Sequence, residues 1–176
     1  MAIQKEKIID IAKSVCPELN VFEHRDQLSL VVPAGKLSEL ALALKESDET
    51  KFDMLVDITA IDWLKREERY EVVYFLYSNQ NKSRVRIKVP LKEDSAVCPS
   101  LVPIWESANW YERETFDMYG IKFDGHPSLR RFYMPEDFNN PTTGESLHPL
   151  RKDFPLMGLD GTLPLPPFPE RDGEPE

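Results

Sequence analysis

The sequence predicts an α+β domain with a mixed or antiparallel sheet and helices on one face. A short charged helix should follow the last hairpin, and an extended proline-rich arm should follow that helix. Three observations support this fold class: two segments with helical apolar periodicity, five segments with strand character, and prolines concentrated after residue 132. We therefore divide the chain into a domain at residues 1–132 and a C-terminal arm at residues 133–176.

Two helices are predicted from apolar residues spaced i, i+3, i+4 and i+7. The stripe of the first, within residues 3–15, consists of Ile8, Ile11, Ala12 and Val15. Pro17 ends this helix because proline disfavours helical backbone in the residue before it. The stripe of the second consists of Leu37, Leu40, Ala41 and Leu44.

Five strands are predicted around these helices. LNVFEH and QLSLVV flank a polar turn, and DMLVDITAID is rich in β-branched residues. EVVYFLYS is apolar on both alternating sets, as expected of a strand covered on both faces. SRVRIKVPL is different, because Arg84, Arg86 and Lys88 share one face and should form a wet or partner-facing side. The turn SNQNK predicts that the last two strands form an antiparallel hairpin.

The short helix is predicted within WYERETFDMYGIKFDGHPSLRR, residues 110–131. Asn109 with Glu112 resembles a capping box at its start, and Gly120 suits the position after its end. At 100° per residue, one face of this helix gathers Trp110, Arg113, Glu114 and Asp117. Arg113 precedes Asp117 by four residues, so we expect an ion pair that keeps this carboxylate ionised.

The residues of this segment disfavour two kinds of catalytic site, a metal site and an acid/base pair. A metal site would use His126 with Glu112, Glu114 or Asp117, but the spacing does not fit HExxH and the chain has three histidines. An acid/base pair of Glu114 and Asp117 conflicts with the pairing to Arg113. We expect instead that Gly125, His126 and Pro127 shape a turn with local hydrogen bonds. The density of Trp and Arg favours a docking surface.

The composition of the chain excludes several classes of partner and site. With 22 Lys and Arg against 31 Asp and Glu, the net charge of −9 disfavours nucleic acid and anionic membrane surfaces. No run of 18 apolar residues or apolar signal region occurs, so we expect no membrane span and a cytoplasmic chain. Cys16 and Cys98 should be unpaired thiols, and two cysteines cannot supply the four ligands of an ordinary iron–sulfur cluster. We assign no catalytic, cofactor or metal site.

The C-terminal arm combines two features. Nine of the 15 prolines lie in the last 44 residues, and no helical or strand period survives there. Its apolar residues are nevertheless too many for an ordinary disordered linker. We expect an extended arm that lies over another surface and docks on partner subunits.

The charged segment closely resembles the signature of the small hydrophilic C subunit of bacterial proton-pumping NADH:quinone oxidoreductase, the 30-kDa subunit family of respiratory complex I. The residues that match are Glu112, Arg113, Glu114, Asp117, Gly120, Phe123, Gly125, His126, Pro127, Leu129, Arg130 and Arg131. The predicted hairpin, LVDITAIDW before it, and the segment 149–155 also resemble family elements. The resemblance covers roughly residues 52–157.

This resemblance implies a non-catalytic subunit of the peripheral arm, on the cytoplasmic side of the cell membrane. Its partners would be the large 49-kDa-type quinone-site subunit and neighbouring iron–sulfur subunits. FMN, iron–sulfur clusters and quinone would lie on partners, with no cofactor in this chain, while the complex passes electrons from NADH to quinone and translocates protons. The interface residues it implies are Trp110, Glu112, Arg113, Glu114, Asp117, Gly120, Gly125, His126, Pro127, Arg130, Arg131, Arg151 and Lys152.

Within that set, the resemblance suggests a partly buried charge network near the interface, formed by Arg113, Glu114 and Asp117. Arg130 and Arg131 would donate to partner carboxylates or carbonyls. Three alternatives remain open: the equivalent subunit of a sister complex, such as a membrane-bound hydrogenase or a ferredoxin- or deazaflavin-dependent dehydrogenase; a stand-alone metal-dependent enzyme using His126; and a transient assembly factor.

Overall fold

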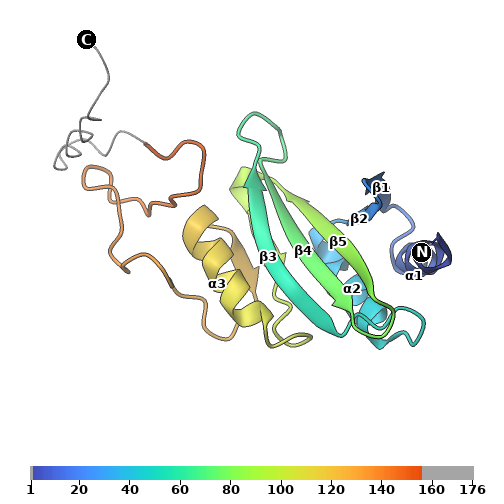
Figure 1. Cartoon of the computed structure of the whole chain (residues 1–176). Coiled ribbons are helices and arrows are strands. Elements are labelled where there is room, and N and C mark those ends of the chain that lie inside the picture. The colour runs from blue at the N-terminus through green and yellow to red at the C-terminus, as the bar shows by residue number, and fades with distance from the viewer. Residues whose placement is uncertain (1, 156–176) are drawn as a thin grey trace, which may run out of the picture.

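The structure is a computed structural model that describes residues 2–155 of the 176-residue chain (Figure 1). All the predicted helices and strands are present. In chain order the elements are α1 (Ala2–Val15), β1 (Asn20–His24), β2 (Gln27–Val31), η1 (Ala34–Lys36), α2 (Leu37–Glu46), β3 (Met54–Asp62), β4 (Tyr70–Ser78), β5 (Ser83–Leu91), η2 (Glu93–Ser95), β6 (Val97–Pro99), α3 (Ala108–Tyr119) and β7 (Lys122–Asp124).

Five strands form one mixed sheet in the order β1-β2-β5-β4-β3. The β2–β5 pair is parallel, with Leu30 opposite Ile87, and the other neighbouring pairs are antiparallel. β4 and β5 form the predicted hairpin, in which Tyr74 also lies opposite Ile87. The α+β class with a mixed sheet is therefore confirmed.

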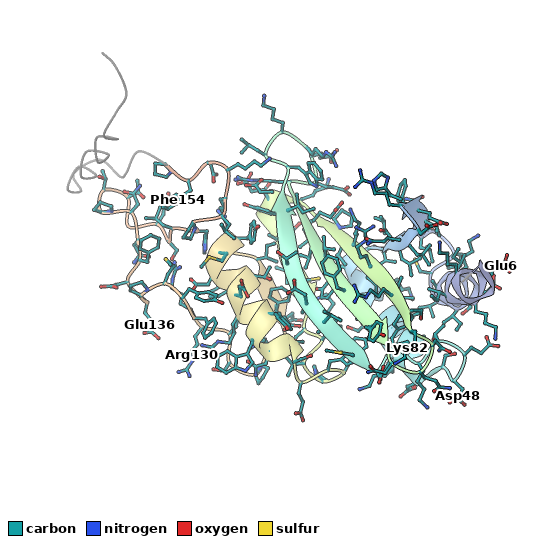
Figure 2. The ribbon with its side chains drawn as sticks, in the orientation of Figure 1. Glu6, Asp48, Lys82, Arg130, Glu136 and Phe154 are labelled. Carbon is teal, nitrogen blue, oxygen red and sulfur yellow. The ribbon has the colours of Figure 1, made fainter. Side chains whose placement is uncertain are left out.

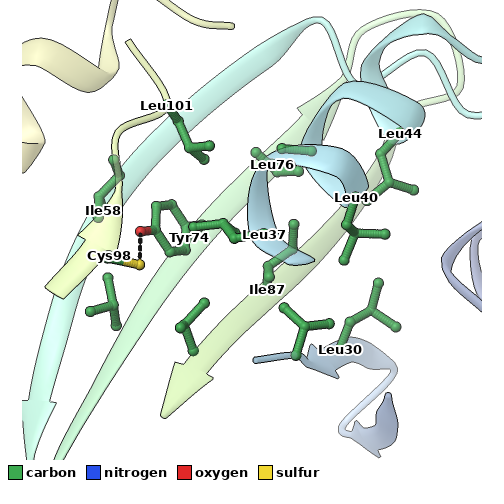
Figure 3. Packing of buried hydrophobic residues seen from close by; sticks show 14 of the residues in the cluster. Leu30, Leu37, Leu40, Leu44, Ile58, Tyr74, Leu76, Ile87, Cys98 and Leu101 are labelled. Atoms are coloured by element: carbon green, nitrogen blue, oxygen red, sulfur yellow. Dashed lines mark hydrogen bonds between the residues drawn. The ribbon is translucent and has the colours of Figure 1, made fainter. Parts of the chain in front are cut away.

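Helix α2 packs its predicted apolar stripe onto one face of this sheet. Figure 3 shows Leu37, Leu40 and Leu44 on the same side of the sheet as Leu30 and Ile87. All five side chains are fully buried. Burying one leucine side chain contributes about 1.5–3 kcal/mol to stability, so this contact is a main source of the fold's stability.

The two cysteines are buried and unpaired, as predicted. The Cys98 thiol lies 3.1 Å from the Tyr74 hydroxyl within the core (Figure 3). Burial raises the pKa of Cys98 to about 12, so its thiol stays protonated at neutral pH. This thiol is a packing group of the core.

The second face of the sheet differs from the expectation for β4. Val73 is buried there, but Phe75 and Tyr77 are only partly buried. In Figure 1 this face of β3, β4 and β5 is turned to the viewer, and no helix of the described residues lies over it. The apolar character of both sides of β4 therefore does not reflect two covering layers within the described chain.

A small parallel sheet, β6–β7, was not predicted. Its strands have three residues each, with Cys98 opposite Phe123, and α3 connects them. Figure 1 shows α3 beside β3, at the opposite end of the main sheet from α1. Within residues 2–155, no helix has the length and apolar character needed to cross a bilayer.

Candidate functional site

Helix α3 lies along the free edge of strand β3. Thr115 Oγ1 donates to the carbonyl of Tyr111 at 2.8 Å and lies 3.4 Å from the carbonyl of Ile58, and Ser107 donates from Oγ to the carbonyl of Leu55 at 3.2 Å. These contacts cover carbonyls of the edge strand that would otherwise be open to another chain. Gly120 ends the helix in the left-handed conformation, with φ of 77°, as predicted.

Asp117, in the last turn of α3, is fully buried and binds the chain that returns over the helix. Its Oδ2 accepts backbone N–H groups of Phe132, Tyr133 and Met134 at 2.7–3.0 Å, while its Oδ1 accepts Arg131 Nη1 at 2.8 Å. Burial favours the neutral acid, but these donors outweigh it and lower the pKa of Asp117. The carboxylate is therefore ionised at neutral pH, as predicted.

Arg131 holds the following segment in place; we call residues 131–154 the strap. Its guanidinium donates to the carbonyl of Leu147 from both Nη1 and Nη2, at 3.2 and 3.1 Å, and to the carbonyl of Phe138 at 3.3 Å. The Arg131 side chain is only 8% exposed. Its donors therefore bind within this chain rather than pointing outward.

The predicted pairing of Arg113 with Asp117 is wrong, because Arg131 occupies the carboxylate. Arg113 instead donates to the carbonyls of Arg130 and Arg131 at 3.3 and 3.2 Å. Its guanidinium also lies 4.9 Å from the ring centre of Trp110 and 5.3 Å from that of Phe132. Arg113 thus fixes the start of the strap against α3.

The far end of the strap has its own anchors on α3. His148 Nδ1 lies 2.9 Å from the carbonyl of Asp117, and the Leu150 N–H donates to the carbonyl of Met118 at 3.1 Å. Arg151 donates from Nε to the carbonyl of Tyr119 at 2.6 Å. These contacts close over Gly120, where a Cβ atom would lie 2.6 Å from His148 Nε2. A residue larger than glycine at this position would have to displace the side chains of His148 and Arg151.

A buried ion pair on the main sheet holds the last residues of the strap. Asp62 accepts Arg69 Nη2 at 3.0 Å and the Lys152 N–H at 2.9 Å, and Asp153 accepts Arg69 Nη2 at 2.8 Å. Burial opposes ionisation of Asp62, yet the Arg69 guanidinium and the backbone donors lower its pKa to about 2. Glu93 also pairs with Arg69. Asp62 and Arg69 were not predicted as site residues, because they lie in and beside strands outside the charged segment.

The predicted capping box is also wrong. Glu112 does not reach back to Asn109; its carboxyl is fully buried and accepts Ser100 Oγ and the Leu101 N–H, both at 2.7 Å. Burial raises the pKa of Glu112 to about 7 despite these donors. Glu112 therefore fixes the loop after β6 to the inner face of α3.

The remaining predicted site residues lie around these anchors. His126 Nδ1 accepts the Ser128 N–H at 3.0 Å and Nε2 lies 3.2 Å from the carbonyl of Asn109, so the expected local hydrogen bonds are confirmed. Gly125, with φ of 80°, and Pro127 form the turn around it. Arg130 and Lys152 are exposed, and Glu114 is partly buried. No three His, Cys, Asp or Glu side chains within residues 2–155 group closely enough to hold a metal ion.

Three exposed aromatic rings stand above these buried charges; we call them the aromatic patch. Trp110, Phe132 and Tyr133 are 55%, 41% and 56% exposed. Trp110 and Phe132 have ring centres 5.0 Å apart, and Phe132 and Tyr133 have theirs 4.5 Å apart. The strap therefore places Phe132 and Tyr133 beside Trp110, which belongs to α3. Aromatic rings held rigidly with an arginine are characteristic of binding hot spots.

Comparisons with other proteins show the family to which this chain is similar. The family model of the respiratory-chain NADH dehydrogenase 30 Kd subunit matches residues 30–159. The C subunit of the NADH-quinone oxidoreductase of Roseiflexus sp. (strain RS-1) is 40% identical over 158 residues, covering 89% of this chain and 87% of that protein. The C subunit from Caulobacter sp. (strain K31) is 46% identical over 132 residues, covering 75% of this chain and 58% of its own length.

Two solved structures share the fold. One is Nqo5, in a trypsin-resistant fragment (1–134), with a TM-score of 0.60 and 28% identity over 72% of this chain and 99% of the fragment. The other is a chain of the membrane-bound sulfane sulfur reductase, an archaeal respiratory membrane complex. It has a TM-score of 0.68 and 30% identity over 88% of this chain and 87% of its own length.

Proposed function

This chain belongs to the family of the respiratory-chain NADH dehydrogenase 30 Kd subunit, and we propose that it is a non-catalytic structural subunit of the peripheral arm of an NADH:quinone oxidoreductase. In this role it supports the module that delivers electrons to quinone, within a complex that also translocates protons. Relatives named as the C subunit of NADH-quinone oxidoreductase, up to 47% identical among those compared, support this assignment.

The aromatic patch is the observation that carries the docking role. Large aromatic side chains left this exposed are costly on a free surface and are enriched where proteins bind one another. Here the polar groups of Arg113 and Asp117 fix the patch in place and are not available for chemistry. We assign the large 49-kDa-type quinone-site subunit as the partner that covers it, with iron–sulfur subunits as neighbours.

The signature residues support this function indirectly. Asp117, Arg131 and Gly120 lie beneath or within the strap, where they fix its path. They are therefore positioning residues for the interface, whereas Trp110, Phe132 and Tyr133 would make the contact itself. The exposed Arg130 and Lys152 are available to meet partner carboxylates or carbonyls.

The chemistry of electron transfer is assigned to partner subunits, which would carry FMN, iron–sulfur clusters and quinone. Cys98 is a protonated core thiol, so it is not poised as a thiolate ligand, and Cys16 is buried at the end of α1. The subunit would lie peripherally on the cytoplasmic side of the cell membrane, held there by its partners.

A second candidate is the equivalent subunit of a sister complex. The structural likeness to a chain of the sulfane sulfur reductase complex favours it, because the same fold can serve a complex with another electron acceptor. The fold of this chain does not distinguish the two, since the sites for donor and acceptor would lie on other subunits.

The experiment that tests the function is co-purification from host membranes. The chain is tagged in its host, membranes are solubilised gently, and partners present in stoichiometric amount are identified by mass spectrometry. We expect quinone-site and iron–sulfur subunits together with a flavin-bearing NADH module. The same core with a different donor or acceptor module would move the chain to a sister complex. Recovery of the chain alone would contradict both.

A further inference from the structure

The uncovered face of the main sheet carries an ordered row of charges. Across the strands, Ser29 on β2 lies opposite Arg86 on β5, which lies opposite Phe75 on β4, which lies opposite Asp57 on β3. Arg86 and Asp57 are thus held apart by an aromatic ring. In the next row towards the β4–β5 turn, Arg84 lies 5.5 Å from the ring centre of Tyr77. Because Arg86 and Asp57 do not pair with each other, both charges are available to bind groups of another molecule.

A groove of about 260 Å³ follows this row across four strands. Its lining residues are Gln27, Leu28, Val56, Asp57, Phe75, Leu76, Arg84, Val85 and Arg86. The β5 end is therefore cationic, the middle is apolar and the β3 end carries one carboxylate. The β-bulge at Val56, a residue that is 39% exposed, borders the groove at that end.

The arginines of the groove lack carboxylate partners in the described part of the chain. Among residues 2–155, neither Arg84 nor Arg86 pairs with a carboxylate, although the neighbouring Lys88 pairs with Glu71 at 2.6 Å. Arg86 Nε is buried from solvent and has no hydrogen-bond partner there. An unsatisfied buried guanidinium N–H is costly, and a carboxylate that accepts from it removes that cost. In a chain of net charge −9, two neighbouring guanidinium groups without a carboxylate partner among the described residues are a specific local feature.

The size of the groove identifies the kind of occupant. Small-molecule sites commonly have volumes of about 300–1,000 Å³ and enclose their ligands, whereas this groove is smaller and open. The groove carries the Asp57 carboxylate as well as the two arginines, so it is not the uniformly cationic surface that nucleic acid or an anionic lipid surface requires. A protein segment that presents one or two side chains fits the space, and the forked donors of Arg86 match a carboxylate.

We propose that this groove docks an extended acidic segment of a partner protein. Its carboxylate binds Arg86 and Arg84, an apolar side chain lies on Phe75, and an amine or amide donor faces Asp57. This surface is separate from the aromatic patch, because it lies on strands β2 to β5 rather than on α3 and the strap. In Figure 2, Lys82, beside the start of β5, lies well away from Arg130, beside the start of the strap. The inference rests on the proposed function and adds a second contact, so that the subunit bridges two partners.

Photo-crosslinking in the host tests this directly. A photoreactive phenylalanine analogue replaces the exposed, groove-lining Gln27 in the tagged full-length chain, membranes are irradiated, and crosslinked peptides are identified by mass spectrometry. We expect one partner segment that contains Asp or Glu. The variant Arg86→Glu should lower the crosslink yield by about tenfold or more, because truncating or reversing one member of a buried charge pair has effects of that size. The exposed Arg84→Glu should lower it in the same direction.

Lys122→Glu is the matched control, since it reverses an exposed cation on the small sheet and should leave the yield at the wild-type level. Thermal unfolding of each variant separates a lost contact from a lost fold. Crosslinks only to lipid, to this chain's own residues 156–176 or to a segment without a carboxylate would overturn the inference, as would a yield insensitive to both arginine variants. Wild-type co-purification reports separately on the proposed function: an intact complex without groove crosslinks refutes the groove alone.

Discussion

Arg131 and Asp117 form a buried ion pair, with Nη1 of the arginine 2.8 Å from Oδ1 of the aspartate. The two residues are 14 positions apart and belong to different elements, the strap and α3. The pair joins a domain with its own core to a segment without helix or strand. The pair holds the strap on α3 and thereby fixes the positions of Phe132 and Tyr133, two of the three rings of the aromatic patch.

Replacing Arg131 should detach the strap without unfolding the domain. Arg131→Ala leaves Asp117 buried with part of its donors lost, an effect on the order of 3 kcal/mol. Amide hydrogen exchange at Leu147 and Leu150 should accelerate, while amides of β4 and β5 keep their protection. Arg130→Ala is the control, because it removes the neighbouring exposed arginine. Equal exchange in both variants would contradict the anchoring role.

Replacement by alanine should lower stability more at Gly120 than at Gly125. Both have left-handed backbone, with φ of 77° and 80°, so alanine costs each about 1 kcal/mol of backbone strain. Only Gly120 also faces the strap, where the new Cβ would meet Arg151 and His148. A Cβ added at Gly125 would have no atom within 4 Å apart from its chain neighbours. Unfolding in urea should show the larger loss for Gly120→Ala. Equal losses would mean that the strap does not pack on this glycine.

Glu112 should make stability fall as pH rises towards neutrality. Its pKa is raised from 4.5 to about 7 by burial, so the native chain keeps a proton that the unfolded chain has released. The contribution is fully present below about pH 4.5 and is lost as pH rises through about 7, a change of roughly 3 kcal/mol. Urea unfolding across this range should show that decline in the wild type.

The variant Glu112→Gln isolates this effect, because an amide of similar shape can still bond Ser100 and Leu101 but does not ionise. Its stability should lack this decline between about pH 5 and about pH 8. The same decline in variant and wild type would assign the pH dependence to other groups.

Arg69 should be more important for stability than its neighbour Arg66. Arg69→Gln leaves the carboxylate of Asp62 buried and unpaired and releases Asp153, with an expected loss of about 3–5 kcal/mol in urea unfolding. Arg66 is exposed and stacks 3.7 Å from the ring centre of Trp63, so Arg66→Gln should cost about 0.5–1 kcal/mol. Similar losses in the two variants would show that the buried pair adds nothing beyond a surface contact.

The main elements could be predicted from the sequence because their signals are local. The stripe from Leu37 to Leu44 and the alternation along residues 83–91 each specify an element and its buried side. Strands β6 and β7 have three residues each, too few to show a period. The capping box failed because the buried loop at Ser100 and Leu101 binds Glu112, a tertiary contact that outweighs local spacing.

In the candidate site, the contacts predicted for the charged residues of α3 were wrong. Helical spacing favoured Arg113 as the partner of Asp117, whereas the chain returns over α3 and brings Arg131 and three backbone N–H groups to that carboxylate. No spacing rule predicts such a return. Asp62 and Arg69 were missed for the same reason, since their joint role depends on residues about 90 positions later. The arm beyond residue 155 lies outside the described residues, and its docking on partners remains a prediction.

Incorporation of a patch variant into the host complex tests the central claim most directly. Trp110→Ala and Phe22→Ala each remove one exposed aromatic ring, at 55% and 60% exposure, the first on α3 and the second on β1. The tagged variants are expressed in place of the wild type, and the amount of each protein in the solubilised complex is quantified by mass spectrometry. We predict that Trp110→Ala lowers incorporation by about tenfold or more, as for a hot-spot residue, while Phe22→Ala leaves it unchanged. Full incorporation of a Trp110→Ala chain would contradict this function, because the aromatic patch would then have no docking role.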